Sequence, residues 1–580
     1  MSGITMLMNI ARGALAAQQM GLDVAGHNVA NVNTPGYTRQ NLVLETSEET
    51  PLSRLKLGYG VTVNSVTQAF DRFTTSNINQ KTSSLSDYET QKATLDYVQG
   101  LFNEATGNGL NKDMMEFWNA WQDLANNPGG IPERTALLEK AQNMVEGFQG
   151  MREGLKKTQD EMNVNLKSGI DQINTLDEQI AKLNERIVES EAIGTKANDL
   201  RDQRNNLLNQ LSQMTDITYI ENDDGALTVL TKSGTGLVDG NLYWTLSQEG
   251  NSIYWNNIQT DMSQQLTGGK MGAYLDLRDN ILPQYMANLD QLAGTMIQQV
   301  NNLHYNGYTI DGLTHKYFFD PIRFNAALTN GTWTGTSAAA VGGAYASTAP
   351  AGTFQFTVTS PSGTVGTDAI TLGWTGPGGT SGTVTLAGAG PGAYVPGTMV
   401  NVSQGLQISL GAGTVVNGNT FSIAVTPNFT DAAKTIALHS DVADTPSNIA
   451  ASQSSDPAET GNNQDALAIQ ALQDQHLNIS KWTYQDRGGV QLSANQSGTM
   501  GDYYNILVGD IGQLDKEAGQ SQDLNQTLIN QLTQLRDSVS GVSLDEEMVN
   551  MMKYQYAYIA ASKLVNASDQ LLQVVLSMRA

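Results

Sequence analysis

The sequence predicts a mainly α-helical protein with some β structure. It would combine a long α-helical core, terminal coiled-coil helices, a small β-hairpin region and an inserted antiparallel β-domain. Three observations predict this class. Apolar residues recur at heptad spacing at both ends of the chain, long amphipathic stretches lie inside it, and one Gly- and Thr-rich segment alternates as strands do. At 580 residues the chain exceeds the size of a single core, roughly 250–300 residues, so we expect several domains.

The first thirty residues predict an amphipathic helix with a narrow apolar seam. Steps of four and three residues alternate along it, which is typical of a coiled coil, and Gln18 is its one polar position. Because alanine buries little apolar area, this helix needs a partner to be stable. The apolar members are Ile4, Met8, Ala11, Leu15, Leu22, Ala25 and Val29.

The last thirty residues predict a second helix of the same kind, with one step of four in place of a three. Each terminal helix could pack on its neighbouring domain, or the two could pair with each other and with other molecules. The matching patterns favour the second interpretation. The C-terminal members are Val549, Met552, Tyr556, Ala560, Leu564, Ala567, Leu571, Val574 and Met578.

The stretch HNVANVNTPGYTRQ, residues 27–40, is predicted to end the N-terminal helix. Asn31 and Asn33 tolerate left-handed backbone geometry, and Pro35 followed by Gly36 favours a turn. We expect Tyr37 to anchor the chain as it leaves the helix. The loop would then set the position at which the terminal helix joins the next domain.

Further helices are predicted inside the chain by their 3.6-residue periodicity. They cover 70–102, 114–125, about 155–216, 274–304, 464–475 and about 503 to the C-terminus. Between them, 217–265 changes to strand-like alternation, with hairpins expected at an Asp-Asp-Gly and an Asp-Gly turn.

An unusual segment lies between Phe324 and Phe429, where Asp368 is the single charged residue. Its composition could belong to a disordered linker. Five alternating segments favour a small antiparallel β-domain instead: FQFTVTS, AITLGWT, TVTLAG, LQISLG and TFSIAVT. The predicted domains are therefore a terminal coiled-coil domain (1–40 plus 541–580), a long-helix core (41–310 plus 450–540) and an outward-facing insertion (311–449).

Composition and motifs argue against an enzyme. A net charge of −25 disfavours nucleic acid as a partner, and the absence of cysteine excludes thiolate chemistry and cysteine-bound metals. The five histidines are scattered, and neither a Walker A motif nor a G-x-S-x-G elbow occurs. We therefore expect no catalytic residues, no metal and no cofactor. The charged run NDLRDQR (198–204) is interpreted as a solvated helix face with local ion pairs.

The N-terminus lacks the basic and apolar regions of a cleavable signal peptide, and no run approaches the ~20 apolar residues of a membrane span. We therefore expect no membrane insertion. By these rules alone the protein would stay in the cytoplasm, unless it is exported by a route that needs no such signal.

The run NVANVNTPGYTRQ after an alanine-rich N-terminal helix, together with the matching C-terminal helix, resembles the axial proteins of the bacterial flagellum: rod, hook and hook-associated proteins. Three further segments narrow the resemblance to the hook-associated proteins of the hook–filament junction. They begin at IDQINTLDEQIAKLNERI, GGKMGAYLDLRDNILPQY and GVSLDEEMVNMMKYQYAY. The resemblance covers about 1–320 and 460–580, whereas the insertion matches no family segment.

The resemblance implies an extracellular structural protein, needed for filament assembly, whose termini form a coiled coil inside the axial tube. It implies export in an unfolded state through the flagellar type III apparatus. Its implied partners are further copies of itself in a ring, the hook protein, a second hook-associated protein and a cytoplasmic export chaperone, which would bind Leu544–Met578.

Two alternatives remain open from the residues. The chain could be another axial protein, such as a hook or distal-rod subunit. It could also be a surface adhesin or glycan-binding module carried by the insertion, whose aromatic residues could line a sugar groove or, as is commoner, fill a core. These aromatic residues are Trp333, Tyr345, Trp374 and Tyr394.

Overall fold

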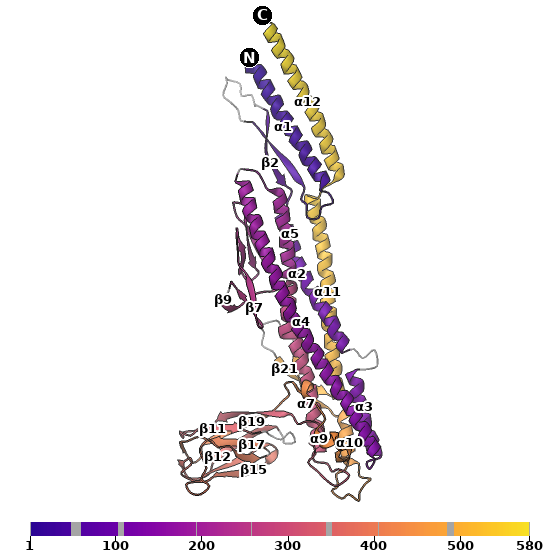
Figure 1. The fold of residues 1–580 in the computed structure, drawn as a ribbon, viewed down its shortest axis with the longest axis vertical. Coiled ribbons are helices and arrows are strands. Elements are labelled where there is room, and N and C mark those ends of the chain that lie inside the picture. Colours follow the sequence, from indigo (N-terminus) through magenta and orange to yellow (C-terminus); the bar gives the residue numbers. More distant parts are fainter. Residues whose placement is uncertain are drawn as a thin grey trace. The chain divides into compact units, whose positions relative to one another are not determined.

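The computed structural model describes residues 2–47, 60–102, 109–192, 194–256, 258–343, 351–403, 405–483 and 492–578. The predicted fold class is confirmed: long helices combine with several small antiparallel sheets (Figure 1). The chain divides into two compact units. The first comprises Met1–Thr94, Asp160–Arg278 and Asp515–Ala580, and the second comprises Leu95–Gln159 and Asp279–Leu514.

In the first unit the two terminal helices lie side by side. Helix α1 (Ser2–Ala30) runs along α12 (Leu544–Ser577) and also contacts a hairpin formed by β1 (Gln40–Thr46) and β2 (Val61–Gln68) (Figure 1). The sequence analysis did not predict this hairpin. Its strands pair Gln40 with Gln68, so the chain that leaves the helix enters a sheet at once.

The core of the first unit lies between helices and two small sheets. The apolar stripe predicted within 155–216 is buried here, including Ile173, Ile180 and Leu211. It lies on α4 (Ile131–Glu191) and α5 (Asn198–Met214), which are joined by a short loop. The predicted hairpins are also confirmed, and they pack on this stripe. Their strands are β3 (Ile217–Glu221), β4 (Leu227–Thr231), β5 (Gly236–Asp239), β6 (Leu242–Tyr243), β7 (Leu246–Glu249), β8 (Ser252–Trp255) and β9 (Ile258–Asp261).

The predicted helix over 274–304 is interrupted. It forms α6 (Gly269–Asp276), a π turn over Leu277–Ile281, and α7 (Leu282–His304). Pro283 has no backbone N–H and therefore cannot continue the i→i−4 ladder, which accounts for the irregular turn before α7. Further α-helices are α2 (Arg72–Leu101), α3 (Leu110–Asn126), α8 (Ala432–Thr435), α9 (Ser440–Ala443) and α10 (Gln464–Gln470).

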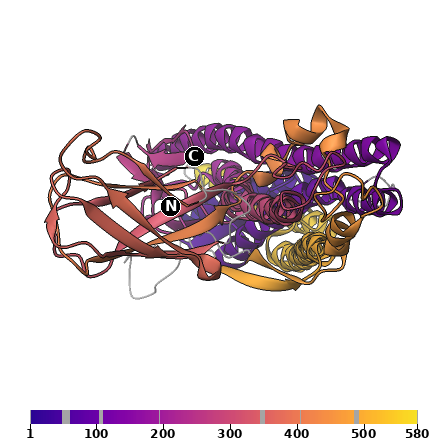
Figure 2. The same cartoon turned by 90° about the horizontal axis from the view of Figure 1, so that it is seen from below.

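The insertion, part of the second unit, is a folded β-domain (Figure 2). All five predicted segments form strands, and a five-stranded sheet, ordered β10-β19-β12-β14-β15, shares one core with a three-stranded sheet, ordered β11-β17-β16. The strands are β10 (Arg323–Asn330), β11 (Ala339–Gly342), β12 (Gly352–Val358), β13 (Gly363–Thr364), β14 (Ile370–Thr375), β15 (Ser381–Leu386), β16 (Val400–Ser403), β17 (Leu406–Leu410), β18 (Thr414–Val415) and β19 (Thr420–Asn428).

The aromatic residues of the insertion belong to this core. Trp374 and Tyr394 are buried, and Trp333 packs against the same cluster. Tyr345 lies outside the described residues. The three described rings are therefore structural and do not line a sugar-binding groove.

The helix predicted from about 503 to the C-terminus is broken. After a hairpin of β20 (Leu477–Thr483) and β21 (Leu492–Gly498), α11 (Met500–Ser540) ends and α12 begins at Leu544. Gly541 permits this break, because a Cβ there would lie 2.4 Å from the carbonyl oxygen of Asp537. Ser543 then caps α12. None of the helices in the described ranges is both long and apolar enough to cross a bilayer.

Candidate functional site: the joint of the terminal helices

The loop that follows α1 forms a compact polar turn. Helix α1 ends at Ala30, and the side chain of Asn31 donates to the carbonyl oxygen of His27 at 3.1 Å. The N–H of Tyr37 donates to the Thr34 carbonyl oxygen at 3.2 Å. The left-handed geometry that asparagine tolerates is not used by Asn31 or Asn33: in this loop Gly36 has the positive φ, +78°. Asn31 instead ends the helix by the hydrogen bond from its side chain to the His27 carbonyl oxygen. Asn33 and Pro35 are exposed.

Tyr37 ties the loop back to the end of α1. Its hydroxyl donates to Asn28 Oδ1 at 2.7 Å and lies 3.1 Å from His27 Nδ1. Asn28, which is 1% exposed, also exchanges two hydrogen bonds with the backbone of Gln40, at 2.9 and 3.0 Å. Burial, and then the charges of nearby aspartates, raise the pKa of Tyr37 well above its ordinary value, so the phenol remains a neutral donor.

Asp202 of α5 holds the other side of the loop. Its carboxylate accepts from the Thr38 N–H at 2.9 Å, from the Thr38 hydroxyl at 2.7 Å and from the Gln68 amide at 2.7 Å. Burial raises the pKa of Asp202 to about 6 even though these hydrogen bonds favour the ionised form. The interpretation of residues 198–204 as a solvated face is therefore wrong, because their partners are remote in sequence: Thr38 is 164 residues away.

Arg39 joins the loop to both C-terminal helices. Its N–H donates to the carbonyl oxygen of Ser540, the last residue of α11, at 2.9 Å. Its guanidinium group contacts the first turn of α12, with Nη1 2.9 Å from Glu546 and Nε 2.9 Å from Glu547. The Nε contact is an ion pair that lacks hydrogen-bond alignment. Arg39 thus provides a hydrogen-bond donor for the last carbonyl group of α11 and a positive charge that neutralises the buried Glu547 of α12.

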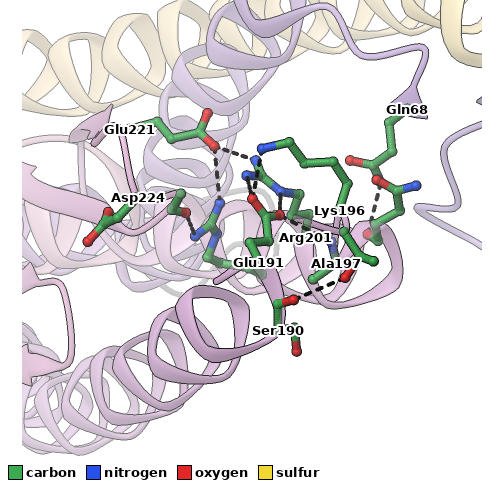
Figure 3. A network of polar contacts seen from close by, with 12 residues as sticks. Gln68, Ser190, Glu191, Lys196, Ala197, Arg201, Glu221 and Asp224 are labelled. Carbon is green, nitrogen blue, oxygen red and sulfur yellow. Dashed lines mark hydrogen bonds and ion pairs between the residues drawn. The ribbon is translucent and has the colours of Figure 1, made fainter. Parts of the chain in front are cut away.

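A second charged cluster lies at the other side of α5 (Figure 3). Arg201 donates two hydrogen bonds to the carboxylate of Glu191, from Nε at 2.7 Å and from Nη2 at 2.9 Å. It also forms an ion pair with Glu221 of β3. Lys196 reaches Glu191 at 2.8 Å. Burial alone would raise the pKa of Glu191, but the hydrogen bonds from Arg201, Lys196 and Ala197 prevail and lower it to about 2. Helix α5 therefore anchors the loop after α1 through Asp202, and the sheet of β3 to β6 through Arg201.

The predicted N-terminal seam is partly buried in the chain. Ala11 and Ala25 are fully buried and Met8 is exposed. Ile4, Leu15, Leu22 and Val29 are half-buried. The apolar pattern missed Gly21, where a Cβ would lie 2.7 Å from the ring of Tyr554 on α12. The missing side chain of Gly21 thus leaves room for the ring of Tyr554.

The predicted C-terminal seam does not face α1. All nine of its members are exposed, and the values for its large side chains run from Met578 at 82% to Leu564 at 42%. The buried residues of α12 are Glu547, Ala561 and Ser568. The structure therefore separates two faces of α12. One face packs within the chain, and the predicted one is left uncovered by it.

Gly36 is expected to be sensitive to substitution. Its φ of +78° is strained for any residue with a side chain, and an added Cβ would lie 2.1 Å from Asn206 Oδ1. We expect Gly36→Ala to lower the free energy of unfolding by about 1–3 kcal/mol, measured by urea denaturation. Gly26→Ala is the matched control, since nothing lies within 4 Å of a Cβ there. An equal loss in both variants would contradict the role assigned to Gly36.

Three segments of the chain match known protein families. Residues 8–38 match the flagella basal body rod protein family, and residues 534–578 match the flagellar basal body rod FlgEFG protein C-terminal family. Residues 95–319 match the flagellar hook-associated protein FlgK helical domain. The N-terminal match includes Asn28 and Tyr37 and ends just before Arg39, and the C-terminal match includes Ser540 and Glu547.

Whole-chain relatives agree. Flagellar hook-associated protein 1 of Bacillus subtilis is 26% identical over 100% of this chain and 99% of its own length. The protein of the same name from Salmonella typhimurium is 26% identical over 99% of this chain and 100% of its own. The fold resembles the flagellar hook junction protein FlgK from Burkholderia pseudomallei, with a TM-score of 0.53, 18% identity, and coverage of 80% of this chain and 100% of that one.

Terminal helices that carry the rod-protein patterns and meet at a polar joint define an axial protein of the bacterial flagellum. Within that class, the chain is similar over its whole length to flagellar hook-associated protein 1, and its residues 95–319 match the helical domain of that protein's family.

Proposed function

We propose that this chain is a structural protein of the bacterial flagellum that forms the junction between hook and filament. The observation that carries the proposal is the joint itself. Tyr37, Arg39 and Asp202 bring the two ends of a 580-residue chain together with a helix of the body. A chain that must become part of a continuous axial tube needs such a fixed connection between its tube-forming ends and its body. The relatives named for the same role support it.

The terminal helices, 1–40 plus 541–580, would form the inner tube domain. The uncovered apolar face of α12 supports this assignment, because it presents a row of large side chains that one chain cannot bury. Its proposed occupants are further copies of the chain in a ring, with the hook protein and a second hook-associated protein as axial neighbours. Before export, the same segment would be held by a cytoplasmic chaperone. The insertion would face outward.

The exposed arms are proposed to gain their final packing only on assembly, after export of the unfolded chain through the type III apparatus. Helix α12 exposes many large apolar side chains, and coupled folding would bury them. Limited proteolysis of the monomer should therefore trim residues beyond Ser540 while the body, including α4 and α7, stays intact. Equal resistance of arm and body would contradict coupled folding.

Electron microscopy of cells that lack the gene tests the junction role. We expect complete hooks without filaments, and flagellin lost to the medium, because new filament subunits would have no platform. Re-expression of the full chain should restore filaments. Normal filaments in the deletion strain would overturn the proposal. The adhesin alternative has no support, since the described aromatic residues of the insertion are packed in its core.

A further inference from the structure

A wide cleft opens in the first unit beside the cluster shown in Figure 3. Its volume is about 870 Å³, and its walls come from the first turn of α2, from α5 and from the β3–β4 hairpin. Four cationic side chains line it, against two acidic ones, Glu221 and Asp223. The cations are Arg72, Lys196, Arg201 and Arg204. In a chain with a net charge of −25, this concentration of positive charge is local and specific.

The positive charge of the cleft is only partly neutralised from within. Arg72 and Arg201 both contact Glu221, and Arg204 lies 4.0 Å from the same carboxylate. Arg204 is 2% exposed, and among the described residues its Nε has no hydrogen-bond partner. Glu191 pairs with Arg201 and Lys196, so two carboxylates, Glu221 and Glu191, pair with the four cations. A further anionic group would be stabilised there.

The rim of the cleft is apolar and uncovered. Phe73, on the first turn of α2, is 78% exposed, and Ile220 of β3 is 58% exposed. Exposed side chains of this size beside a hollow are typical of a surface that another protein covers. The cleft thus fits a partner element that combines large apolar side chains with carboxylates.

The same unit carries such an element. On α11, Leu524, Leu535 and Val539 are 60%, 54% and 49% exposed. At 100° per residue these three side chains lie on one face of α11. A different face of the helix, which carries Ile529 and Thr533, lines a second cavity. One acidic side chain, Asp523, borders this stripe, and it is exposed. We call the exposed part of α11 between Asp523 and Val539 the α11 ridge.

We propose that the α11 ridge of one copy docks into the cleft of a second copy, with its leucines against Phe73 and Ile220 and Asp523 facing the arginines. This inference rests on the proposed function, because it names the lateral contact of the ring. Cleft and ridge are different surfaces of one chain, so the contact is heterologous and propagates from copy to copy. A ring or a helical row follows from it, as an axial protein requires.

Cysteine cross-linking tests the contact in flagellated cells. The chain has no cysteine, so an introduced pair is the only possible site of reaction within it. With Phe73→Cys and Leu535→Cys on the same chain, a short impermeant bismaleimide should yield a ladder in multiples of 62.3 kDa. Each single variant should yield no ladder. The matched control is Phe73→Cys with Val164→Cys, because Val164 of α4 is 69% exposed and lies outside both surfaces. It too should stay monomeric.

The possible results distinguish a failure of the proposed ridge–cleft contact from a failure of the proposed junction function. Filaments present with only monomers in the cross-linked sample would overturn the inference and leave the proposed function standing. Products of another mass would mean that a different protein fills the cleft, which also overturns it. A charge swap gives an independent readout: Arg72→Glu and Asp523→Lys should each reduce the number of filaments per cell several-fold, and the double variant should restore it. A double variant no better than either single one would refute the pairing.

Discussion

Arg39→Met is expected to produce the largest loss of stability of any single change at the joint. Glu547 is 2% exposed, and Arg39 is its cationic partner at 2.9 Å. Removing the cation leaves a buried carboxylate uncompensated, which typically costs about 3–5 kcal/mol. Urea denaturation, followed together with hydrogen exchange of α12, would measure the loss and locate it.

Two companion variants define the cause of that loss. The double variant Arg39→Met with Glu547→Met removes both charges and should recover most of the stability, because no ion remains buried. Arg536→Met is the matched control, since its partner Asp537 is 54% exposed and the pair is worth little. If the double variant is as unstable as Arg39→Met, the ion pair is not the source of the effect.

The second large effect is a pH dependence that originates in the second unit. Asp465 is 3% exposed, its Oδ2 atom has no hydrogen-bond partner among the described residues, and burial raises its pKa to about 7. The folded chain therefore holds a proton that the unfolded chain has lost. The stabilisation from Asp465 is complete below about pH 4 and is lost as the pH rises through about 7.

At ~1.4 kcal/mol per pKa unit, this shift corresponds to about 4 kcal/mol. The free energy of unfolding should therefore rise when the pH is lowered from 7.5 to 5. Asp202 and Asp290 act in the same direction, since burial raises the pKa of each to about 6. Asp465→Asn should raise stability at pH 7.5 and flatten the pH profile, whereas the exposed Asp171→Asn should change neither. An unchanged slope in Asp465→Asn would refute the assignment.

The sequence predicted the helices well because their apolar period is a local property. It could not predict which face of α12 packs on α1. Large apolar side chains such as Leu571, Leu572, Val574 and Val575 occur around much of that helix, so the period does not single out one face. The residue that makes room for Tyr554 of α12 is Gly21, and a search for apolar stripes ignores glycine.

The polar joint was only half visible in the sequence. The loop itself was recognisable from Asn31, Pro35 and Gly36, and its role as the end of α1 is confirmed. Its partners were not, because Asp202 lies far along the chain in a run that reads locally as a charged helix face. Hydrogen bonds between remote segments leave no period in a sequence, so only the structure could assign NDLRDQR to the joint.

The way in which Arg39 is held has a mechanical consequence. Apolar helix surfaces slide past one another at little cost, whereas hydrogen bonds and ion pairs weaken steeply when their geometry is distorted. Since Arg39 contacts both sides of the break between α11 and α12, a twist applied to the terminal pair reaches the body through short directional bonds. In the proposed assembly, the terminal helices would adjust their packing against neighbours while torque passed through this stiff coupling at their base.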